Sequence, residues 1–536
     1  MVAVERFASL EAPEQVRVAT TFAVLFSLTK DPVAPQTTVT SGPVDATGRL
    51  RMNLPAAPGR TAWDLDIVLS SPGCALASGS NLARISLPID GDSTMARFDL
   101  VARPITQTTQ ATRLHATVWH AGAFLGRVSR DLTIAAAEAP RTEPASLPES
   151  PQTIPPPAPL RVALDLSIAP PDLTIYLRSD PSAPTRQEVT VVSRVFQTPT
   201  TGTWETGDTS KWLEERASEL AATRAFRGRP AEIPDQKPQP AAARLVGLGR
   251  ELYERCAPPQ FQQVFWALAE RLGSGFQSIA VYTDDPRVPW ELMRPCTADG
   301  KTERGFLGTE FRLGRWHISP TTATRERPPQ SFHFQQLAVV APQYSGDRNL
   351  PGQRSELAAL QQIAGYRAVA GSREALGDML RTAATGILHY AGHGTMTVAA
   401  NGTPTFAIQL EDGTLDLTTW RGLSPNRYEG NPLFFLNACE VGQAQRVARF
   451  VDGWAPLVLE LGGVGCIGAL CPVDDAGAAA FAVEFYRRVR TGLESGSASI
   501  GDALRAARRA RLDAGDSSGL AYVYYGDPEL KLLPRK

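Results

Sequence analysis

A run of prolines divides this chain and limits how it folds. Eight prolines fall within the 22 residues from 139 to 160. Proline has no amide hydrogen to donate and favours an extended backbone, so this segment is a poor candidate for a helix or an inner strand. The chain, at 536 residues, is also too long for one ordinary domain. We therefore expect a semi-rigid linker at residues 137–160, with a folded part on each side.

Before the linker, residues 1–136 alternate apolar and polar side chains with a period of two. The alternation is clearest in residues 16–28, 63–69 and 114–118, and turns containing glycine or proline separate such runs. Short strands broken by turns are typical of an antiparallel β-sandwich. We predict a sandwich here and expect it to bind an activator or sensor protein. Residues 18–28 resemble a secretory signal, but glutamates precede them and no cleavage site follows, so we predict none.

After the linker, the pattern changes to strands that alternate with helices. Residues 161–275 form a mixed region of strand and helix patterns that leads into residues 276–536. In the latter range, apolar runs that predict strands alternate with stretches of helical period; the strands are expected at residues 279–282, 337–341, 387–390, 432–437 and 464–470. This order predicts an α/β domain with a mostly parallel sheet covered by helices on both faces. Reactive groups of such sheets collect at the carboxyl ends of the strands.

Two of these strands end in reactive side chains. One runs into Gly-His393-Gly394 and the other into Asn-Ala-Cys439. A cysteine nucleophile needs a nearby base, because the free thiol is mostly protonated at neutral pH, and a histidine at a neighbouring strand end can supply that base. We predict His393 as the base and Cys439 as the nucleophile. The backbone amides of Gly394 and Cys439 are the predicted oxyanion hole.

Simpler interpretations of these residues exist. A lone cysteine after an apolar strand is usually a small buried core residue. His389 and His393 have the i, i+4 spacing of metal ligands, but no carboxylate accompanies them as in HExxH, and the segment is predicted to be strand and loop. We therefore expect no metal and no cofactor. His389 alternates with apolar neighbours, which indicates a packed or hydrogen-bonded role.

Seven short motifs occur in an order that resembles the CHAT domain peptidases, relatives of caspases and separase. They lie within residues 240–533 and comprise Pro289-Trp290-Glu291, Leu307-Gly308 with Arg315, Leu350-Pro351-Gly352 with Glu356, and the segments 389–394, 436–442, 463–475 and 524–528. The resemblance implies a caspase-like fold. It also implies hydrolysis of peptide bonds through a thioester, with His393 and Cys439 as the catalytic pair and no required third member. Family members usually carry a tryptophan at the position of Cys471, so we expect a differently lined substrate pocket and treat Cys471 as packing.

Asp474 and Asp475 follow the strand after the nucleophile and have two interpretations. The resemblance to separases implies that an aspartate here faces the residue before the scissile bond, which would favour Arg or Lys through a charge-assisted contact. Alternatively, an aspartate caps the helix predicted at residues 476–490. One aspartate could cap while the other binds. A basic preference would also make residues 321–330, which contain Arg325 and Arg327, a candidate self-cleavage segment.

The composition of the chain limits which binding partners and which cell compartment we expect. The 54 basic residues nearly balance the 55 acidic ones, so neither nucleic acid nor a membrane surface is the expected partner. The six cysteines are too sparse for a disulfide framework, which favours the cytoplasm. The arginines between residues 487 and 511 are expected on solvated helix faces. The sequence thus predicts a regulated cysteine endopeptidase acting on protein substrates, of a kind that resembles bacterial defence or signalling modules. The alternatives are a catalytically silent CHAT scaffold for protein–protein interaction and a different thiol hydrolase, such as an amidase.

Overall fold

The computed structural model describes most of the chain. The described residues are 2–31, 38–41, 49–54, 61–71, 73–78, 80–105, 107–120, 123–136, 170–180, 183–196, 199–207, 209, 212–213, 215–216, 239–285, 288–317, 328–329, 331–381, 386–398, 404–428, 430–439, 450–470, 473–496 and 498–533. The predicted linker at residues 137–160 and Cys471 lie outside these residues, as does nearly all of the candidate self-cleavage segment.

The chain divides into two compact units. The first comprises Met1–Leu166 and Ser179–Thr203, and the second comprises Ser167–Arg178 and Trp204–Lys536. The strands of the first unit are β1 (Val2–Glu11), β2 (Gln15–Arg17), β3 (Thr21–Thr29), β4 (Thr38–Ser41), β5 (Leu50–Leu54), β6 (Ala62–Ser70), β7 (Cys74–Ser78), β8 (Leu82–Pro88), β9 (Ala96–Ala102), β10 (Thr109–His120), β11 (Ala123–Ala135) and β13 (Ala183–Ser193), and most of β14 (Thr200–Glu205) also falls here.

The N-terminal strands form two sheets around one core. One sheet has the order β5-β1-β3-β9-β7, and the other has the order β2-β11-β10-β6-β8 with β4 beside β11. All the pairs are antiparallel except β2 with β11. Apolar side chains from both sheets, such as Phe26 and Ile67, belong to a single buried cluster. The antiparallel N-terminal sheets expected from the period of two are therefore present.

The second unit alternates strands and helices. Its elements are β12 (Leu173–Asp180), α2 (Gln239–Cys256), α3 (Pro259–Leu272), β15 (Ser278–Thr283), α4 (Leu307–Glu310), β16 (Arg312–His317), β17 (Ser331–His333), β18 (Gln336–Val340), α5 (Pro351–Leu360), β19 (Tyr366–Val369), α6 (Arg373–Arg381), β20 (Gly386–Val398), β21 (Pro404–Leu410), β22 (Gly413–Asp416), α7 (Leu417–Leu423), β23 (Leu433–Cys439), α8 (Phe450–Glu460), β24 (Gly465–Ala469), α9 (Asp475–Glu494), α10 (Ile500–Asp513), β25 (Tyr522–Tyr525) and β26 (Lys531–Leu533). Short 3₁₀ turns connect several of them, including one at Gly346–Arg348.

The central sheet of the second unit is mixed. Its strand order is β12-β15-β16-β25-β24-β23-β20-β18-β19. Neighbours pair in parallel on both sides of the junction between β24 and β25, but these two strands pair antiparallel. The far end of β20 also continues into an antiparallel pair with β21. The prediction of a mostly parallel sheet is thus only partly right, because the closing strand β25 enters the middle of the sheet and not its edge.

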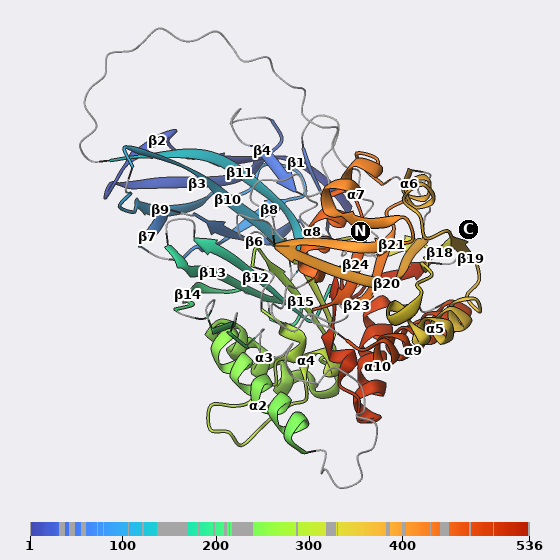
Figure 1. Ribbon diagram of the computed structural model, residues 1–536. Helices are drawn as coiled ribbons and strands as arrows, with labels where there is room; N and C mark the ends of the chain where they lie inside the picture. The colour runs from blue at the N-terminus through green and yellow to red at the C-terminus, as the bar shows by residue number, and fades with distance from the viewer. Residues whose placement is uncertain are drawn as a thin grey trace. The chain divides into compact units, whose positions relative to one another are not determined.

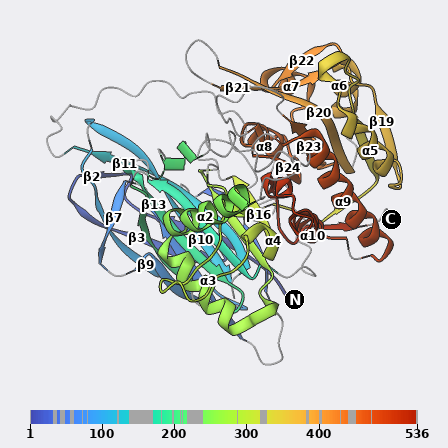
Figure 2. The same ribbon diagram turned by 60° about the horizontal axis from the view of Figure 1, so that its bottom comes forward.

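Helices cover both faces of this sheet. Figures 1 and 2 show α5, α9 and α10 on one face and α6 and α7 on the other. On the α6 and α7 side, the strand residues Leu388 and Phe434 join a core that includes Trp420 and Trp454. The intervening positions of the same strands, such as Phe435, pack against aromatic residues of α9. Alternate residues of β20 and β23 therefore pack against the helices on opposite faces of the sheet.

A buried ion pair joins two of the family-like motifs. Glu291 and Arg315 are both fully buried, and the guanidinium of Arg315 contacts both carboxylate oxygens of Glu291. The guanidinium also lies 5.8 Å from the ring centre of Tyr525 on the adjacent strand. The pair fixes the segment before α4 to β16, in the half of the sheet away from β20.

The expectation of solvated arginines on α9 and α10 is wrong for one residue. Arg487 is half-exposed and pairs with Glu484, as expected for a surface position. Arg508, in contrast, is fully buried and donates hydrogen bonds to the carbonyl oxygens of Tyr522 and Gly308. Burial lowers the pKa of Arg508 to about 10. Its guanidinium holds α10 to β25 and α4, a role that a helical pattern of arginines does not reveal.

Candidate active site

The two predicted catalytic residues form the last backbone pair between two neighbouring strands. β20 and β23 run parallel, and their backbone register pairs Ala391 with Asn437 and His393 with Cys439. Adjacent strands in a sheet lie about 4.8 Å apart. The parallel pairing of these two strands ends at this row, since the next residue, Gly394, pairs with Ile408 of β21. Cys439 is described only by its backbone, and residues 440–449 lie outside the described part of the chain.

A backbone carbonyl orients the imidazole of His393. Nε2 of His393 lies 2.7 Å from the carbonyl oxygen of Arg348, in the turn before α5. A carbonyl oxygen only accepts hydrogen bonds, so Nε2 must carry the hydrogen in this contact. In the neutral ring, Nδ1 then carries the lone pair. The ring of Tyr344 packs beside the imidazole at a centroid distance of 4.5 Å, and His393 is only 6% exposed.

Two tyrosine hydroxyls hold the backbone of the same residue. The amide of His393 donates to the hydroxyl of Tyr344 over 3.2 Å, and the hydroxyl of Tyr390 donates to the carbonyl of His393 over 2.9 Å. Tyr344 also donates to the carbonyl of Gln409 over 2.7 Å, which ties the site to β21. Burial raises the pKa of Tyr344, so its hydroxyl stays protonated. A Cβ at Gly392 would lie 2.5 Å from both hydroxyls, so the residue before His393 must be glycine for this clamp to form.

A second histidine lies deeper in the sheet and is fully buried. Nε2 of His389 lies 2.8 Å from Oε1 of Glu356, on α5, and Nδ1 lies 3.1 Å from the hydroxyl of Tyr486, on α9. The same Glu356 oxygen accepts a hydrogen bond of 2.6 Å from Nδ2 of Asn437. Both nitrogens of His389 therefore have protein partners, in agreement with the hydrogen-bonded role expected from its position inside the strand. Across the described residues, no group of three or more His, Cys, Asp or Glu side chains is arranged to hold a metal ion.

The two aspartates after β24 contact backbone amides. Asp474 is the N-cap of α9, and its Oδ1 accepts a hydrogen bond of 2.5 Å from the amide of Gly477. Oδ2 of Asp475 accepts one of 2.5 Å from the amide of Gly352, in the first turn of α5. Burial raises the pKa of Asp474, and the nearby carboxylates of Asp516 and Asp475 raise it further. The capping interpretation thus describes Asp474, while Asp475 ties α9 to the helix that follows Arg348.

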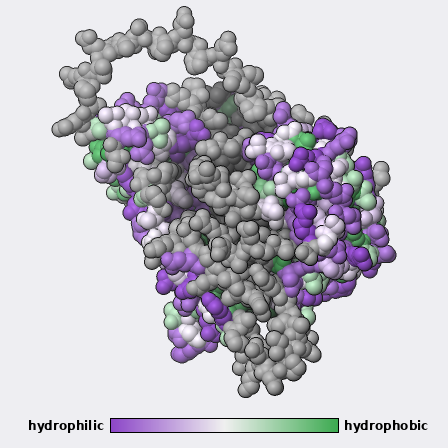
Figure 3. Space-filling view, in the orientation of Figure 1, coloured by the Kyte–Doolittle hydropathy of each residue, from purple (hydrophilic) through white to green (hydrophobic). Residues whose placement is uncertain are grey.

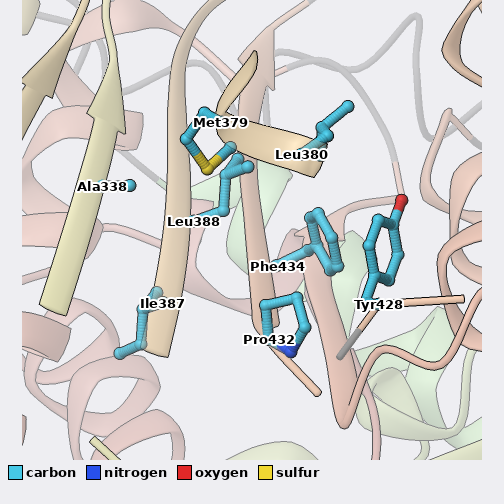
Figure 4. Close-up of a pocket in the computed structure, with 8 residues that line it drawn as sticks. All are labelled: Ala338, Met379, Leu380, Ile387, Leu388, Tyr428, Pro432 and Phe434. Carbon is cyan, nitrogen blue, oxygen red and sulfur yellow. The ribbon is translucent and has the colours of Figure 1, made fainter. Parts of the chain in front are cut away.

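An apolar pocket on the same sheet lies away from these groups. Its lining residues, shown in Figure 4, are Ala338, Met379, Leu380, Ile387, Leu388, Tyr428, Pro432 and Phe434. Ile387 is at the start of β20, and six residues at about 3.3 Å each separate it from His393 by about 20 Å. This pocket is therefore at the opposite end of the strands from the candidate site.

The visible surface of the described residues is mostly hydrophilic (Figure 3), with hydrophobic residues in small patches. The large hydrophobic side chains exposed among the described residues are Leu76, Ile89 and Met95, all in the first unit. Within the described residues, no helix combines the length and the apolar character that a membrane span requires.

Sequence reasoning missed two contributors to the site. The carbonyl of Arg348 leaves no signal in the sequence, because every residue carries the same group. Tyr344 follows a predicted strand by three residues, and only the fold brings its ring against His393. A signal was present for Glu356, which belongs to a family-like motif, but the pattern did not reveal its partners.

Comparisons with known proteins find one matching family and several partly similar structures. The family model for the CHAT domain matches residues 246–522, just over half of the 536 residues. Gingipain R, an Arg-specific cysteine proteinase of known structure, is 14% identical over 60% of this chain and 76% of its own, with a TM-score of 0.34. A structure described as a protease is 11% identical with the same coverage and a TM-score of 0.33.

A cohesin module from a family 33 glycoside hydrolase of Clostridium perfringens is 10% identical, over 25% of this chain and 98% of the module, with a TM-score of 0.15. These structural likenesses are too partial to carry an argument of their own. No curated protein matches the chain. The match to the CHAT domain spans the strands that carry His393 and Cys439 and the helix that carries Glu356.

Proposed function

This chain belongs to the CHAT domain family of caspase-like cysteine-protease folds, and on that premise we propose that it is a cysteine endopeptidase whose catalytic pair is His393 and Cys439. The observation that carries the proposal is the backbone register, which pairs these two residues on neighbouring parallel strands. Neighbouring strands lie about 4.8 Å apart, so side chains at one register position are within reach of each other.

The orientation of the imidazole supports a role as general base. Nε2 faces the carbonyl of Arg348, and the nitrogen with the lone pair is Nδ1. In the proposed reaction, Nδ1 of His393 takes the proton of the Cys439 thiol as the sulfur attacks the scissile carbonyl carbon. The tetrahedral intermediate collapses to a thioester, and the leaving amine receives the proton from His393. A water molecule, deprotonated by the same imidazole, then hydrolyses the thioester and regenerates the thiol.

We assign the oxyanion hole to the backbone amides of Gly394 and Cys439. Preorganised amide donors stabilise the negative charge that develops on the carbonyl oxygen. The backbone pair of His393 and Cys439 is called the catalytic row below. Gly394 is the first residue after this row, where β20 stops pairing with β23 and begins to pair with β21. A glycine there lets substrate approach the amide without a side chain in the way.

Labelling with an electrophilic peptide tests the proposal directly. We expect a peptidyl acyloxymethyl ketone to modify wild-type protein at Cys439, detected by intact mass and peptide mapping. Cys439→Ala should abolish labelling, and His393→Ala should slow it by about 10²–10⁴-fold, the usual contribution of a general base. Cys466→Ala is the matched control, since Cys466 is a fully buried cysteine in β24.

The outcomes separate three functions. Labelling that depends on both residues, together with cleavage of a denatured protein substrate, supports an endopeptidase. Equal labelling of wild type and His393→Ala, or none at Cys439, would leave only the catalytically silent scaffold. Labelling with turnover of small amides and no protein cleavage would indicate an amidase.

We further propose that Asp474 or Asp475 favours Arg or Lys before the scissile bond. Each aspartate uses one oxygen on a backbone amide, which leaves its other oxygen without a partner in these two contacts. Asp474 lies near the carboxylates of Asp475 and Asp516, and their mutual repulsion contributes to its raised pKa. A substrate cation would relieve this repulsion. A peptide panel that varies only this residue tests the preference, and equal cleavage of Arg, Leu and Asp peptides would refute it.

Regulation and location are part of the same proposal. We infer that the N-terminal β-sandwich binds an activator or sensor protein and that the enzyme acts on protein substrates in the cytoplasm, in a bacterial defence or signalling module. Cys74, Cys296 and Cys466 are free thiols, and free thiols are typical of a reducing compartment. Affinity capture with residues 1–136 and with the full chain, each compared for the same bound protein, would test the role of the sandwich.

A further inference from the structure

One buried carboxylate connects the two strands that carry the candidate catalytic pair. Glu356 is 3% exposed and projects from α5. Its Oε1 lies 2.8 Å from Nε2 of His389 on β20 and 2.6 Å from Nδ2 of Asn437 on β23. A carboxylate oxygen accepts hydrogen bonds, so each strand donates to the same atom. Glu356 thus bridges β20 and β23 from outside the sheet.

The bridge is close to the catalytic row. Asn437 pairs with Ala391, and the row His393 with Cys439 follows two residues later on both strands, about 7 Å away at the rise of a strand. Ala391, the backbone partner of Asn437, also contacts α5, because Nε2 of Gln353 donates to the carbonyl of Ala391 over 2.8 Å. Both residues beneath the catalytic row therefore contact the same helix, one turn apart.

The carbonyl of Arg348, which orients the imidazole of His393, lies just before α5 in the chain. Arg348, whose carbonyl accepts from Nε2 of His393, lies three residues before the first residue of α5, Pro351. The first turn of α5 is in turn held to α9 by the contact of Gly352 with Asp475. A shift of α5 would therefore move the Arg348 carbonyl and the row below the catalytic pair together.

Tyrosines complete the network on both sides. The hydroxyl of Tyr522 donates to Oδ1 of Asn437 over 2.5 Å, which fixes the direction of the amide. The hydroxyl of Tyr486 contacts Nδ1 of His389. Burial raises the pKa of Tyr486 well above its ordinary value, so the hydroxyl remains protonated and can donate to Nδ1 while Nε2–H donates to Glu356. The network therefore has one consistent assignment of donors and acceptors.

Stability alone is a poor explanation for this arrangement. Burying a carboxylate against a histidine carries a large desolvation cost, and replacing such groups by well-packed apolar residues is often neutral or stabilising. What apolar residues cannot do is fix a register, since the directed hydrogen bonds to His389 and Asn437 are satisfied in only one alignment of the strands.

We propose that Glu356 is a positioning residue that sets the alignment of β20 with β23 and hence the separation of the His393 imidazole from the Cys439 sulfur. The inference rests on the proposed peptidase function. Misplacement of a catalytic group by about 1 Å can cost about 10²-fold in rate. Loss of the Glu356 contacts should therefore slow attack by Cys439 even in fully folded protein.

The test measures the second-order rate constant for modification of Cys439 by the peptidyl ketone and the dependence of that constant on pH. For Glu356→Leu, which removes the acceptor shared by His389 and Asn437, we expect a rate constant about 10-fold to 100-fold lower than wild type and a displaced pH midpoint. His389→Gln retains a nitrogen donor near the position of Nε2, so it should react faster than His389→Leu. Glu291→Leu is the matched control, because it removes another buried, paired carboxylate that contacts β16 and not β20 or β23.

A purely structural role predicts a different result. Unfolding reduces the fraction of protein that reacts but leaves the rate constant and the pH midpoint of the folded fraction unchanged, and Glu291→Leu should behave in this way. Equal rate constants for Glu356→Leu and Glu291→Leu would overturn the inference while leaving the peptidase proposal intact. If Glu356→Leu does not fold, equal rate constants for His389→Gln and His389→Leu have the same meaning. Failure of wild-type Cys439 to react would overturn both proposals.

Discussion

Nε2 of His393 lies 2.7 Å from the backbone carbonyl of Arg348, so a main-chain group orients the imidazole of the candidate base. Mutation of the Arg348 side chain leaves that carbonyl in place, and the side chain itself is exposed. We expect Arg348→Ala to keep most of the peptidase activity. Arg348→Pro should retain the carbonyl but restrict the backbone of the turn and of Asp347 before it, and should lower kcat by about 10-fold or more. Steady-state kinetics on one peptide substrate would compare the two variants.

The hydroxyl of Tyr344 offers a milder test of the same site. Tyr344→Phe keeps the ring beside His393 but removes the acceptor for the His393 amide and the donor to Gln409. A lost hydrogen bond of this kind is worth about 1 kcal/mol. We expect kcat to fall by about 3-fold to 10-fold with little change in KM. Tyr366→Phe, on the edge strand β19, is the control, and an equal effect in both variants would contradict a local role for Tyr344.

Gly392 should tolerate no side chain. A Cβ there would lie 2.5 Å from the hydroxyls of Tyr344 and Tyr390, a separation that forces the clamp apart. Gly392→Ala should therefore lower both activity and Tm. Gly422→Ala, on α7, meets no atom within 4 Å and replaces glycine in a helix, so it should leave activity unchanged and stabilise by up to about 1 kcal/mol. Thermal denaturation and peptide kinetics would show the contrast, and similar losses in both variants would refute it.

The buried pair of Glu291 and Arg315 predicts a non-additive effect on stability. Removing one partner leaves a buried charge without compensation and costs about 3–5 kcal/mol. Glu291→Gln and Arg315→Met should each reduce the free energy of unfolding by about this amount. The double variant should lose less than the sum of the two, because the partner that either single change leaves unpaired is removed as well. Chemical denaturation of the four proteins gives the coupling energy, and strictly additive losses would contradict the pairing.

The proposed basic specificity has a predicted pH dependence. Burial, with Asp516 and Asp475 nearby, raises the pKa of Asp474 above that of an ordinary aspartate. As pH falls, Asp474 therefore takes up a proton at a higher pH than an exposed aspartate would, and its attraction for a substrate guanidinium is lost there. As the pH is lowered through the pKa of Asp474, the ratio of kcat/KM for Arg peptides to kcat/KM for citrulline peptides should fall. At higher pH this ratio should be constant. In Asp474→Asn the ratio should be low and independent of pH; a decline that persists in this variant would assign the effect elsewhere.

Several features of the molecule were predictable from local patterns. The period of two in residues 16–28 corresponds to β2 and β3, and the apolar runs that end at His393 and Cys439 correspond to β20 and β23. Helix α9 begins at Asp475, one residue before the start that the sequence predicted. These predictions succeeded because periodicity and capping depend on neighbours within a few residues. The mixed direction of the sheet was not predictable, because the antiparallel entry of β25 beside β24 is decided by long-range packing.

The sequence by itself determined which residues are chemically competent: a histidine between glycines and a cysteine after a strand, within motifs that resemble one family. Only the tertiary structure decided how the base is oriented, because the carbonyl of Arg348 is a backbone group present at every position. Only the tertiary structure, too, joined Glu356 to His389 and Asn437, which are separated by 33 and 81 residues along the chain. The physical reason is the range of the interactions: propensity and alternation act between near neighbours, whereas hydrogen bonds of buried groups depend on which distant segments the folded chain brings into contact.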